Sequence, residues 1–595
     1  MTKCLNILSP TKQKLFNKSI FGFDIETSDD NKSFVVASIV GENYKQFFYT
    51  KDQVITELKS NKIFRNAVIF ATNLSFDFFG TFFKESDAKN FFTLFRGSDL
   101  LLAKTHFYNN DFYPQAKIKT KSLKSLLFLD SMNFAKLSVS KMGNIIGLPK
   151  LEHPDCLGKT PQNIQDWYAI KEYNLRDSEI TLKFMKFLIN SFEYLGATFK
   201  NTLASTSMSL FKNKYLDKAY FQPDTDKLIE QFKSYYGGRT EAFKRGTFKD
   251  HNYYDFNSLY PSVMVDQVFP DPNSVRISHK NNMTYINNYE GISDIDIYVF
   301  PTKYPVLPFR NDQGRVIFPI GNIRGWYTHI EIKEAIKHGA VVKKVYKTQY
   351  FKKTCTPFKG YMTDLYNLRN EFKADHNQME YVVKIMMNSL YGKFGQKFTD
   401  KDNWVHEDQV TLKDLQSNKN PERKGCYFRL VQEFSRPACF CIPIWASYVT
   451  AYGRIKLHQA IVQTNPIYCD TDSLITSVTL PTSDKLGALK LEMAIKEGIV
   501  VRPKFYALID KNDNNYVKIK GLGKRLNFLE FIGLMHYPLV YYDKFTKFKE
   551  ALRRDLIPNQ ILEVHKQFSL EDEKRLWDNE FDYKVLEDSI PIENL

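Results

Sequence analysis

Apolar and polar residues follow strand-like and helix-like patterns in the first third of the chain. Residues 19–27 alternate after a first turn and predict a strand with one side facing a core. An apolar run at 67–71 leads into an Asp-containing strand end or helix start at 73–77. Thr160-Pro161 has the cap-then-proline pattern of a helix start, and helical periodicity continues to about Leu195.

The remainder of the chain predicts three further elements. Residues 252–262 begin as a β-prone run and end in a turn before Pro261, a residue suited to the first position of a helix. The strongest helical segment spans 361–394, and around 467–476 β-prone flanks enclose a tight turn, which predicts strand, turn and strand. This helical segment carries an apolar stripe that we expect to be buried: Val383, Met387, Leu390 and Phe394.

Acidic residues give these elements a candidate chemistry. Asp470 and Asp472 are two residues apart in an extended segment, so their side chains share one face. Two carboxylates repel unless a cation lies between them, and hard oxygen ligands favour Mg²⁺ or Mn²⁺. An isolated Asp-x-Asp is more often an ordinary turn, so the interpretation depends on acids elsewhere. Asp255, at the end of a predicted strand, is one of them.

Four acids and a phenol lie in the first 195 residues. Asp24 and Glu26 share a strand face, Asp77 lies at a strand end or helix start, and Tyr173 and Asp177 are four apart on a helix. Taken alone, Asp24 and Glu26 fit the exposed side of a surface strand, and Asp77 fits a helix cap. Tyr173 alone fits a ring packed over its neighbouring turn. Together the carboxylates can hold two divalent ions about 4 Å apart, with Tyr173 orienting the nucleophile.

The order of the motifs extends the interpretation. Tyr-x-Asp-Thr-Asp-Ser at 468–473 resembles the C motif of family B DNA polymerases, while 255–262 and 384–392 resemble the A and B motifs. Upstream, Phe-Asp-Ile-Glu-Thr, Asn-x₂-Phe-Asp and Tyr-x₃-Asp resemble its proofreading 3′→5′ exonuclease. The resemblance covers nearly the whole chain and implies two Mg²⁺ or Mn²⁺ ions per active site. The implied metal ligands are Asp24, Glu26, Asp77 and Asp177 for the exonuclease, and Asp255, Phe256, Asp470 and Asp472 for the polymerase.

The same resemblance implies nucleotide ligands. Tyr260 would stack under the incoming sugar and exclude a 2′-hydroxyl, and Lys384 would pair with the triphosphate. Amides at 258–260 would face outward at a helix start, a site suited to phosphate. The full set is Ser258, Leu259, Tyr260, Arg369, Lys373, Lys384, Asn388 and Tyr391.

It also implies contacts to DNA. Ser131-Met132 resembles the family's Ser-Leu motif with Met in place of Leu, and Lys150 is, with equal weight, the exonuclease lysine or one of many surface lysines. The residues expected at a frayed single-stranded 3′ end are Thr27, Asn73, Phe76, Ser131 and Met132. Those expected at the template are Tyr235, Gly237 and Gly238, and those at the primer end are Lys504, Tyr506, Lys518 and Lys520.

Composition agrees with a large nucleic-acid-binding protein. A chain of 595 residues predicts about three to five compact units, and a formal charge of +16 favours a polyanionic partner. The aromatic content of 15% suits base stacking, although AT-rich coding bias explains it equally well. Seven cysteines without a C-x₂-C pair predict a reducing compartment and no structural zinc. We find no signal or membrane-spanning segment, and expect host cytoplasm if the source is viral.

We therefore predict an α+β, multidomain fold. A ribonuclease H-like exonuclease would occupy 1–195, followed by a right-hand polymerase. The expected parts are palm at 196–265 and 431–525, a first insertion at 266–360, fingers at 361–395, a second, looped insertion at 396–430, and thumb at 526–595. Short length with insertions at these two places resembles the protein-primed branch of small tailed bacteriophages and linear plasmids.

The expected function is a monomeric DNA-directed DNA polymerase with a proofreading exonuclease. It would start from a terminal-protein hydroxyl, use primer-template DNA and dNTPs, and replicate a linear genome by strand displacement. One alternative is a compact, nucleic-acid-primed family B polymerase. Another is an inactive DNA-binding relic, which the retention of all seven metal-site acids disfavours. Lys384, Asn388 and Tyr391 follow i, i+4, i+7 spacing on one helix face, which an exonuclease alone would not need.

Overall fold

The computed structural model describes residues 7–28, 33–82, 90–96, 99–396, 401–407, 410–417, 421–424, 427–432, 438–546 and 561–594. Cys4, Cys426 and parts of the predicted second insertion and thumb lie outside these ranges. Within them, no helix is long and apolar enough to cross a membrane.

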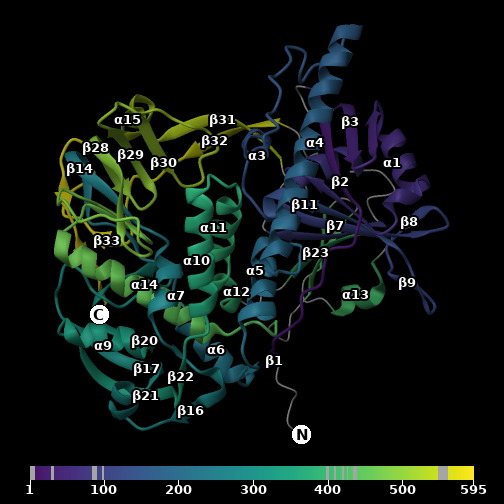
Figure 1. The fold of residues 1–595 in the computed structure, drawn as a ribbon. Coiled ribbons are helices and arrows are strands. Elements are labelled where there is room, and N and C mark those ends of the chain that lie inside the picture. Colours follow the sequence, from purple (N-terminus) through teal and green to yellow (C-terminus); the bar gives the residue numbers. More distant parts are fainter. Residues whose placement is uncertain are drawn as a thin grey trace.

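The first part of the chain forms an eight-stranded mixed sheet, called here the N-terminal sheet (Figure 1). Its central pairs β2/β5 and β5/β11 are parallel, and apolar β5 is buried throughout. Its strands are β2 (Ile20–Thr27), β3 (Phe34–Gly41), β4 (Tyr44–Phe48), β5 (Ala67–Ala71), β6 (Phe92–Arg96), β7 (Asp99–Tyr108), β8 (Asp111–Tyr113) and β11 (Ser125–Asp130). Its helices are α1 (Lys51–Ser60), α2 (Leu74–Phe82), α3 (Val139–Ile145) and α4 (Ile164–Leu195).

The predicted strand at 19–27 and the end of the predicted helix at Leu195 are confirmed, but the predicted helix start is wrong. Helix α4 begins at Ile164, because the side chain of Asn163 accepts the amide of Asp166 and satisfies a free N–H of the first turn. Gly196, with φ of 100°, ends the helix in the left-handed conformation that glycine adopts without strain.

A second sheet, called here the central sheet, is antiparallel and carries the predicted hairpin at 467–476. Its strands are β13 (Thr240–Ala242), β14 (Lys244–Phe256), β26 (Tyr468–Asp470), β27 (Ser473–Thr476), β28 (Leu489–Arg502), β29 (Phe505–Asp510) and β30 (Asn515–Ile519). The order is β13-β26-β27-β14-β28-β29-β30, so β14 and the β26–β27 hairpin are neighbours. Two helices flank it, α7 (Leu259–Asp266) and α14 (Pro443–Thr464). Pro261 is therefore the third residue of α7 rather than its first.

Between the two sheets stands a helical hairpin (Figure 1). The single segment predicted at 361–394 is divided into α10 (Lys359–Ala374), α11 (Met379–Ser389) and the short α12 (Tyr391–Phe394). The apolar stripe from Val383 to Phe394 is buried, as predicted. It belongs to one core that also contains Phe192 of α4 and Trp445 of α14, so the hairpin packs against both parts of the molecule.

A five-stranded sheet, the lower sheet, forms below α14 (Figure 1). It consists of β16 (Val275–Ser278), β17 (Glu290–Val299), β20 (Ile320–Thr328), β21 (Val341–Phe351) and β36 (Glu593–Asn594), with helix α9 (His329–Lys337) beside it. The chain end thus returns to this sheet, pairing β36 with β20.

The interval 396–430, predicted to be looped, contains regular structure. Strands β23 (Lys401–His406), β24 (Glu422–Lys424) and β25 (Tyr427–Gln432) form a sheet, joined by α13 (Leu412–Ser417). Polar composition had suggested a loop, but strand pairing satisfies backbone groups whatever the side chains are. Further on, α15 (Phe528–His536) precedes a hairpin of β31 (Leu539–Phe545) and β32 (Ile561–Gln567).

Candidate active sites

The four acids of the first third converge at one end of the N-terminal sheet. Asp24 and Glu26 lie on β2, Asp77 in the first turn of α2, and Asp177 on α4. The amide of Ile25 donates to Asp77 Oδ1 at 3.3 Å, which fixes α2 against β2. The sequence did not predict a role for Asn174, whose Nδ2 donates to Asp24 Oδ2 at 2.7 Å. Its position directly after Tyr173 is the feature of the sequence that could have pointed to it.

Burial and mutual repulsion dominate the electrostatics of this group. Burial raises the pKa of Asp24, and the charges of Glu26, Asp77 and Asp177 raise it further. Burial and Asp177 raise the pKa of Glu26 to about 7. The buried atoms Asp77 Oδ2 and Asp177 Oδ1 have no hydrogen-bond partner among the described residues. Unpaired carboxylate oxygens in one buried group fit divalent cations, so the donor set suits Mg²⁺ or Mn²⁺.

Lys150 belongs to this group and is not one of many exposed lysines. Its Nζ pairs with Asp177 and lies 4.5 Å from the ring centroid of Tyr173. The Tyr173 hydroxyl in turn lies 3.4 Å from the ring of His153. Of the two alternatives that the sequence left open for Lys150, an ordinary surface lysine does not fit this position.

The side chains expected at a single-stranded 3′ end differ in how exposed they are to solvent. Met132 and Asn73 are exposed, whereas Ser131 is fully buried and its hydroxyl contacts Thr72 at 3.0 Å. Asp130, not singled out by the sequence, accepts the amides of Asn73 and Leu74 and orients this loop. Thr27 is buried at the end of β2, and Phe76 is half-buried in α2.

A second group of acids lies at the end of the central sheet. Asp255 is next to the end of β14 and is paired in register with Ser473, and Asp470 ends β26. Asp472 occupies the turn between β26 and β27, and its carbonyl accepts the amide of Phe256 at 2.7 Å. This bond ties the predicted A and C motifs together.

Within the second group, Asp470 is the acid that has a cationic partner among the described residues. Lys504 Nζ lies 2.7 and 2.9 Å from the two carboxylate oxygens of Asp470, which also accepts a hydrogen bond from Thr240 at 2.9 Å. Among the described residues, neither Asp255 nor Asp472 forms a salt bridge. Burial and the charge of Asp472 raise the pKa of Asp255 to about 7, and burial and Asp470 raise that of Asp472. The facing pair of Asp255 and Asp472 therefore fits a divalent cation best.

An aromatic wall stands beside these acids. The ring of Tyr260, at the start of α7, lies 4.7 Å from that of Tyr391, centroid to centroid. Its other side meets α14 at Gly453, where a Cβ would come within 2.9 Å of the ring. Tyr260 is thus held between two elements while part of it remains exposed. The adjacent Leu259 is 1% exposed, so only its backbone can face a nucleotide.

The helical hairpin presents polar side chains. Lys384 and Asn388 of α11 are exposed, and Tyr391 of α12 is half-buried against Tyr260. Arg369 is committed to a salt bridge with Glu380, with Nε to Oε1 at 2.8 Å. Lys373, in the last turn of α10, is exposed.

The residues expected at the primer end border a basic pocket. A cavity of about 820 Å³ is lined by residues that include Lys504, Lys518, Lys520, Lys524 and Arg525. Lys504 precedes β29 in a left-handed conformation with φ of 60°, so Lys504 and Tyr506 do not lie on one side of a continuous strand. Tyr506 is largely buried and packs on Tyr468 with ring centroids 5.2 Å apart.

The segment Tyr235-Tyr236-Gly237-Gly238 packs against the turn between β26 and β27. A Cβ on Gly238 would lie 2.8 Å from Thr471, in the turn between β26 and β27, whereas one on Gly237 would meet nothing within 4 Å. The ring of Tyr235 packs where a Cβ on Gly395 would come within 2.5 Å of it. Gly238 is therefore needed so that the turn between β26 and β27, which contains Asp472, can pack against this segment.

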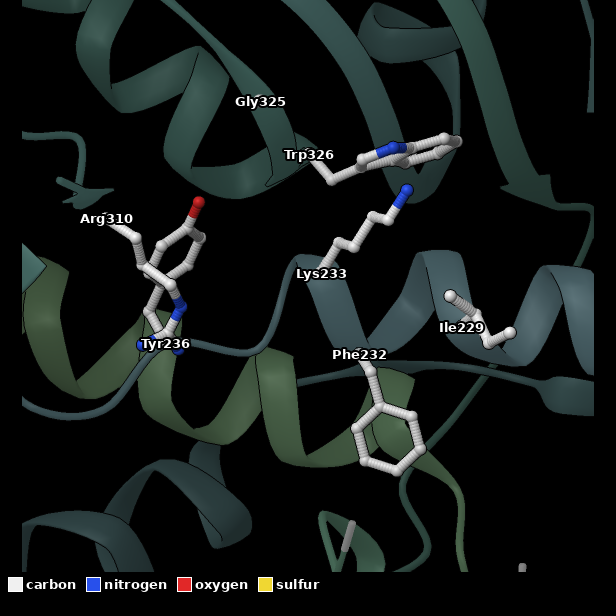
Figure 2. A pocket seen from close by; sticks show the side chains of 7 residues that line it. All are labelled: Ile229, Phe232, Lys233, Tyr236, Arg310, Gly325 and Trp326. Carbon is white, nitrogen blue, oxygen red and sulfur yellow. The ribbon is translucent and has the colours of Figure 1, made fainter. Parts of the chain in front are cut away.

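Beside this segment lies a basic and aromatic pocket of about 470 Å³ (Figure 2). It opens between α6 (Thr225–Lys233) and β20, and the guanidinium of Arg310 lies 5.0 Å from the ring centroid of Tyr236. Figure 2 shows Lys233 extending alongside Trp326. Rings with adjacent cations suit stacking and phosphate contacts with nucleic acid.

Comparisons with known proteins agree with the arrangement of motifs. Residues 159–429 match the family described as DNA polymerase type B, organellar and viral. Over these residues the chain is similar to the type B DNA polymerases. The chain is 27% identical over 373 residues to a probable DNA polymerase of Ascobolus immersus, covering 59% of this chain and 30% of that protein. It is 29% identical over 317 residues to the DNA-directed DNA polymerase of Enterobacteria phage PRD1, covering 49% and 52%.

The fold of this chain resembles a solved one along most of its length. It aligns with the phi29 DNA polymerase complexed with primer-template DNA and incoming nucleotides, with a TM-score of 0.71 and 17% identity over 93% of this chain and 100% of that one. The α+β, multidomain fold is therefore phi29-like, as the sequence predicted. The chain spans less than two thirds of the length of the two sequence relatives above.

Proposed function

We propose that this chain is a DNA-directed DNA polymerase that extends a primer at Asp255 and Asp472. The observation that carries the proposal is the pair of carboxylates that, among the described residues, forms no salt bridge. It lies beside Tyr260 and Tyr391, and Lys384 is exposed on α11. A bound divalent ion would supply Lewis-acid stabilisation of charge on the reacting oxygens. In this layout the central sheet is the palm, α10–α12 the fingers and the β31–β32 hairpin part of the thumb.

Each side chain has a distinct task in the proposed reaction. Asp255 and Asp472 would hold the cation, while Asp470 holds Lys504 near the primer end. Tyr260 would support the deoxyribose face, with Tyr391 limiting the movement of its ring. Lys384, Asn388 and the amides at the start of α7 would bind the triphosphate and new base pair.

We propose a second activity, a 3′→5′ exonuclease, at the N-terminal acids in a ribonuclease H-like domain. The four carboxylates include buried oxygens without a hydrogen-bond partner in the described part of the chain, and they would hold divalent ions, while Tyr173 with Lys150 would orient the attacking water. The exposed Asn73 and Met132 would contact the frayed strand. Removing Asp24 and Glu26 together should eliminate degradation of single-stranded DNA while primer extension continues.

We further propose that synthesis starts from a hydroxyl of a terminal protein and proceeds by strand displacement on a linear genome. The lower sheet and the β23–β25 sheet occupy the two intervals where the sequence resembles the insertions of the protein-primed branch. Strand β23 lies against β6 of the N-terminal sheet, so the second insertion bridges toward the exonuclease. We expect the polymerase to act as a monomer on primer-template DNA and dNTPs.

The polymerase proposal is tested by extension of a labelled primer with dNTPs and Mg²⁺. Wild type should extend it, and Asp255→Ala should not, while the variant still degrades single-stranded DNA. Robust extension by Asp255→Ala would overturn the assignment.

Priming is tested separately, by incubating the polymerase with a protein encoded beside its gene and labelled dNTPs. Covalent dNMP transfer to that protein supports the protein-primed branch. Extension of DNA primers without any such transfer would favour the nucleic-acid-primed alternative.

A further inference from the structure

A cluster of two histidines and one glutamate lies at the contact between α9 and α14, and it includes none of the residues assigned to the two acidic sites. The residues are Glu334 and His338 at the end of α9, and His458 of α14. One potential ligand atom from each lies within 4.8 Å of those of the other two. Figure 1 shows α9 beside α14, where the lower sheet meets the central part of the molecule.

His458 is already oriented as a ligand. Its Nε2 lies 2.9 Å from the carbonyl oxygen of Tyr304, and because a carbonyl only accepts, Nε2 carries the proton. In the neutral ring Nδ1 is then a bare acceptor. His458 is 2% exposed, and among the described residues its Nδ1 has no hydrogen-bond partner. Histidines that bind metals usually donate their other N–H to a carbonyl or carboxylate in this manner.

The other two ligands come from one face of α9. Glu334 and His338 are four residues apart, and Glu334 Oε1 lies 3.5 Å from His338 Nε2. The second oxygen of Glu334 lies 3.4 Å from Nζ of Lys337, which extends into solvent. The rings of His338 and His458 are 4.8 Å apart, centroid to centroid. Oε1 and the two rings therefore surround a common position.

We propose that Glu334, His338 and His458 bind one zinc-type divalent transition-metal ion. Two imidazoles and a carboxylate suit such an ion, whereas Mg²⁺ prefers oxygen ligands alone. His338 is exposed, which leaves an entry path and a position for water. Arg239, whose charge acts on His458, is paired with the buried Glu241 and so leaves Glu334 to balance the ion.

The site would fasten the lower sheet to the central part of the molecule. Helix α9 belongs to the predicted first insertion, whereas α14 leads directly into the β26–β27 hairpin that carries Asp470 and Asp472. The absence of C-x₂-C pairs had predicted no structural zinc, but that pattern is silent on sites built from histidine and glutamate. A metal here would act on the position of the insertion and not on the phosphoryl-transfer chemistry.

The test is zinc binding by the full chain in an excess of Mg²⁺, which occupies the carboxylate sites. Wild type should retain about one zinc per chain after gel filtration, and Co²⁺ in its place should give the intense visible bands of a four-coordinate site with nitrogen ligands. His338→Gln is the informative variant because the side chain is exposed and its loss should not prevent folding. We expect it to weaken zinc binding by at least 10-fold and to abolish the cobalt bands.

His279→Gln is the matched control, since His279 is an exposed histidine of the same region that lies outside the cluster. It should bind zinc as wild type does. The proposal is overturned if wild type retains no zinc, or if His338→Gln binds zinc and cobalt as wild type does. Primer extension in Mg²⁺ alone should be the same for wild type and His338→Gln, so failure of the polymerase assignment remains a separate result.

Discussion

Asp255→Asn should make the metal-free protein more stable while it abolishes primer extension. Burial and the charge of Asp472 raise the pKa of the Asp255 carboxyl from its usual 3.8 to about 7. The folded protein thus binds this proton more tightly than the unfolded chain does. The contribution of the neutral Asp255 carboxyl to the free energy of unfolding is therefore fully present below pH about 4. It is lost as the pH rises to about 7. Above pH 7 the folded protein carries the whole cost of the charge, which asparagine removes.

The magnitude follows from the same values. A pKa change from 3.8 to about 7 would correspond to about 4 kcal/mol, because a tenfold change in proton affinity is worth about 1.4 kcal/mol. Asp255 is only partly buried, so solvent screening reduces this cost, and we expect about 1–2 kcal/mol. For a cooperative unit of 150–250 residues, that raises Tm by about 2–8 °C.

Thermal unfolding in EDTA at pH 8 and pH 5 measures the effect. Asp255→Asn should exceed wild type at pH 8, and the difference should shrink at pH 5, where the wild-type carboxyl is already protonated in the folded state. Mg²⁺ should stabilise wild type more than the variant. Asp312→Asn, an exposed acid in a loop, is the control and should change little. An Asp255→Asn protein no more stable than wild type at pH 8 would refute the electrostatic account of the site.

Three further substitutions test neighbouring residues. Tyr260→Val should admit ribonucleotides much more readily with little loss of dNTP insertion, because the held ring leaves no volume for a 2′-hydroxyl; equal losses for both in single-nucleotide kinetics would make Tyr260 a packing residue. Gly238→Ala should slow extension by at least 10-fold by displacing Thr471, whereas Gly237→Ala, which has open space, should not, and equal rates would contradict the packing argument. Lys504→Met should lower extension by at least 10-fold, since Asp470 loses its cation; an unchanged extension rate would show that this ion pair is not needed at the primer end.

Local patterns predicted the elements that carry the chemistry. The hairpin around 467–476 and the strand under Asp24 and Glu26 follow from alternation and turn residues, which act over a few neighbours. The face shared by Tyr173 and Asp177 follows from helical spacing. Their convergence with Asp77 came only from the resemblance, because no local pattern reports contacts between distant elements.

What the sequence did not predict depends on such distant contacts. The contact of Lys150 with Asp177 joins a loop to a helix 27 residues away. The role of Gly238 becomes visible only once Thr471 lies against it. Likewise His458 looked unremarkable until α14 brought it to α9, where its unpaired nitrogen faces Glu334 and His338.

The most direct test of the central account assays extension and degradation with the same three proteins. Wild type, Asp472→Ala and the double variant Asp24→Ala/Glu26→Ala should each be given a labelled primer-template with dNTPs and, separately, labelled single-stranded DNA, both with Mg²⁺. We predict that Asp472→Ala loses extension and keeps degradation, while the double variant does the reverse. Loss of both activities in either well-folded protein, or of neither, would contradict two separate acidic sites with separate chemistry.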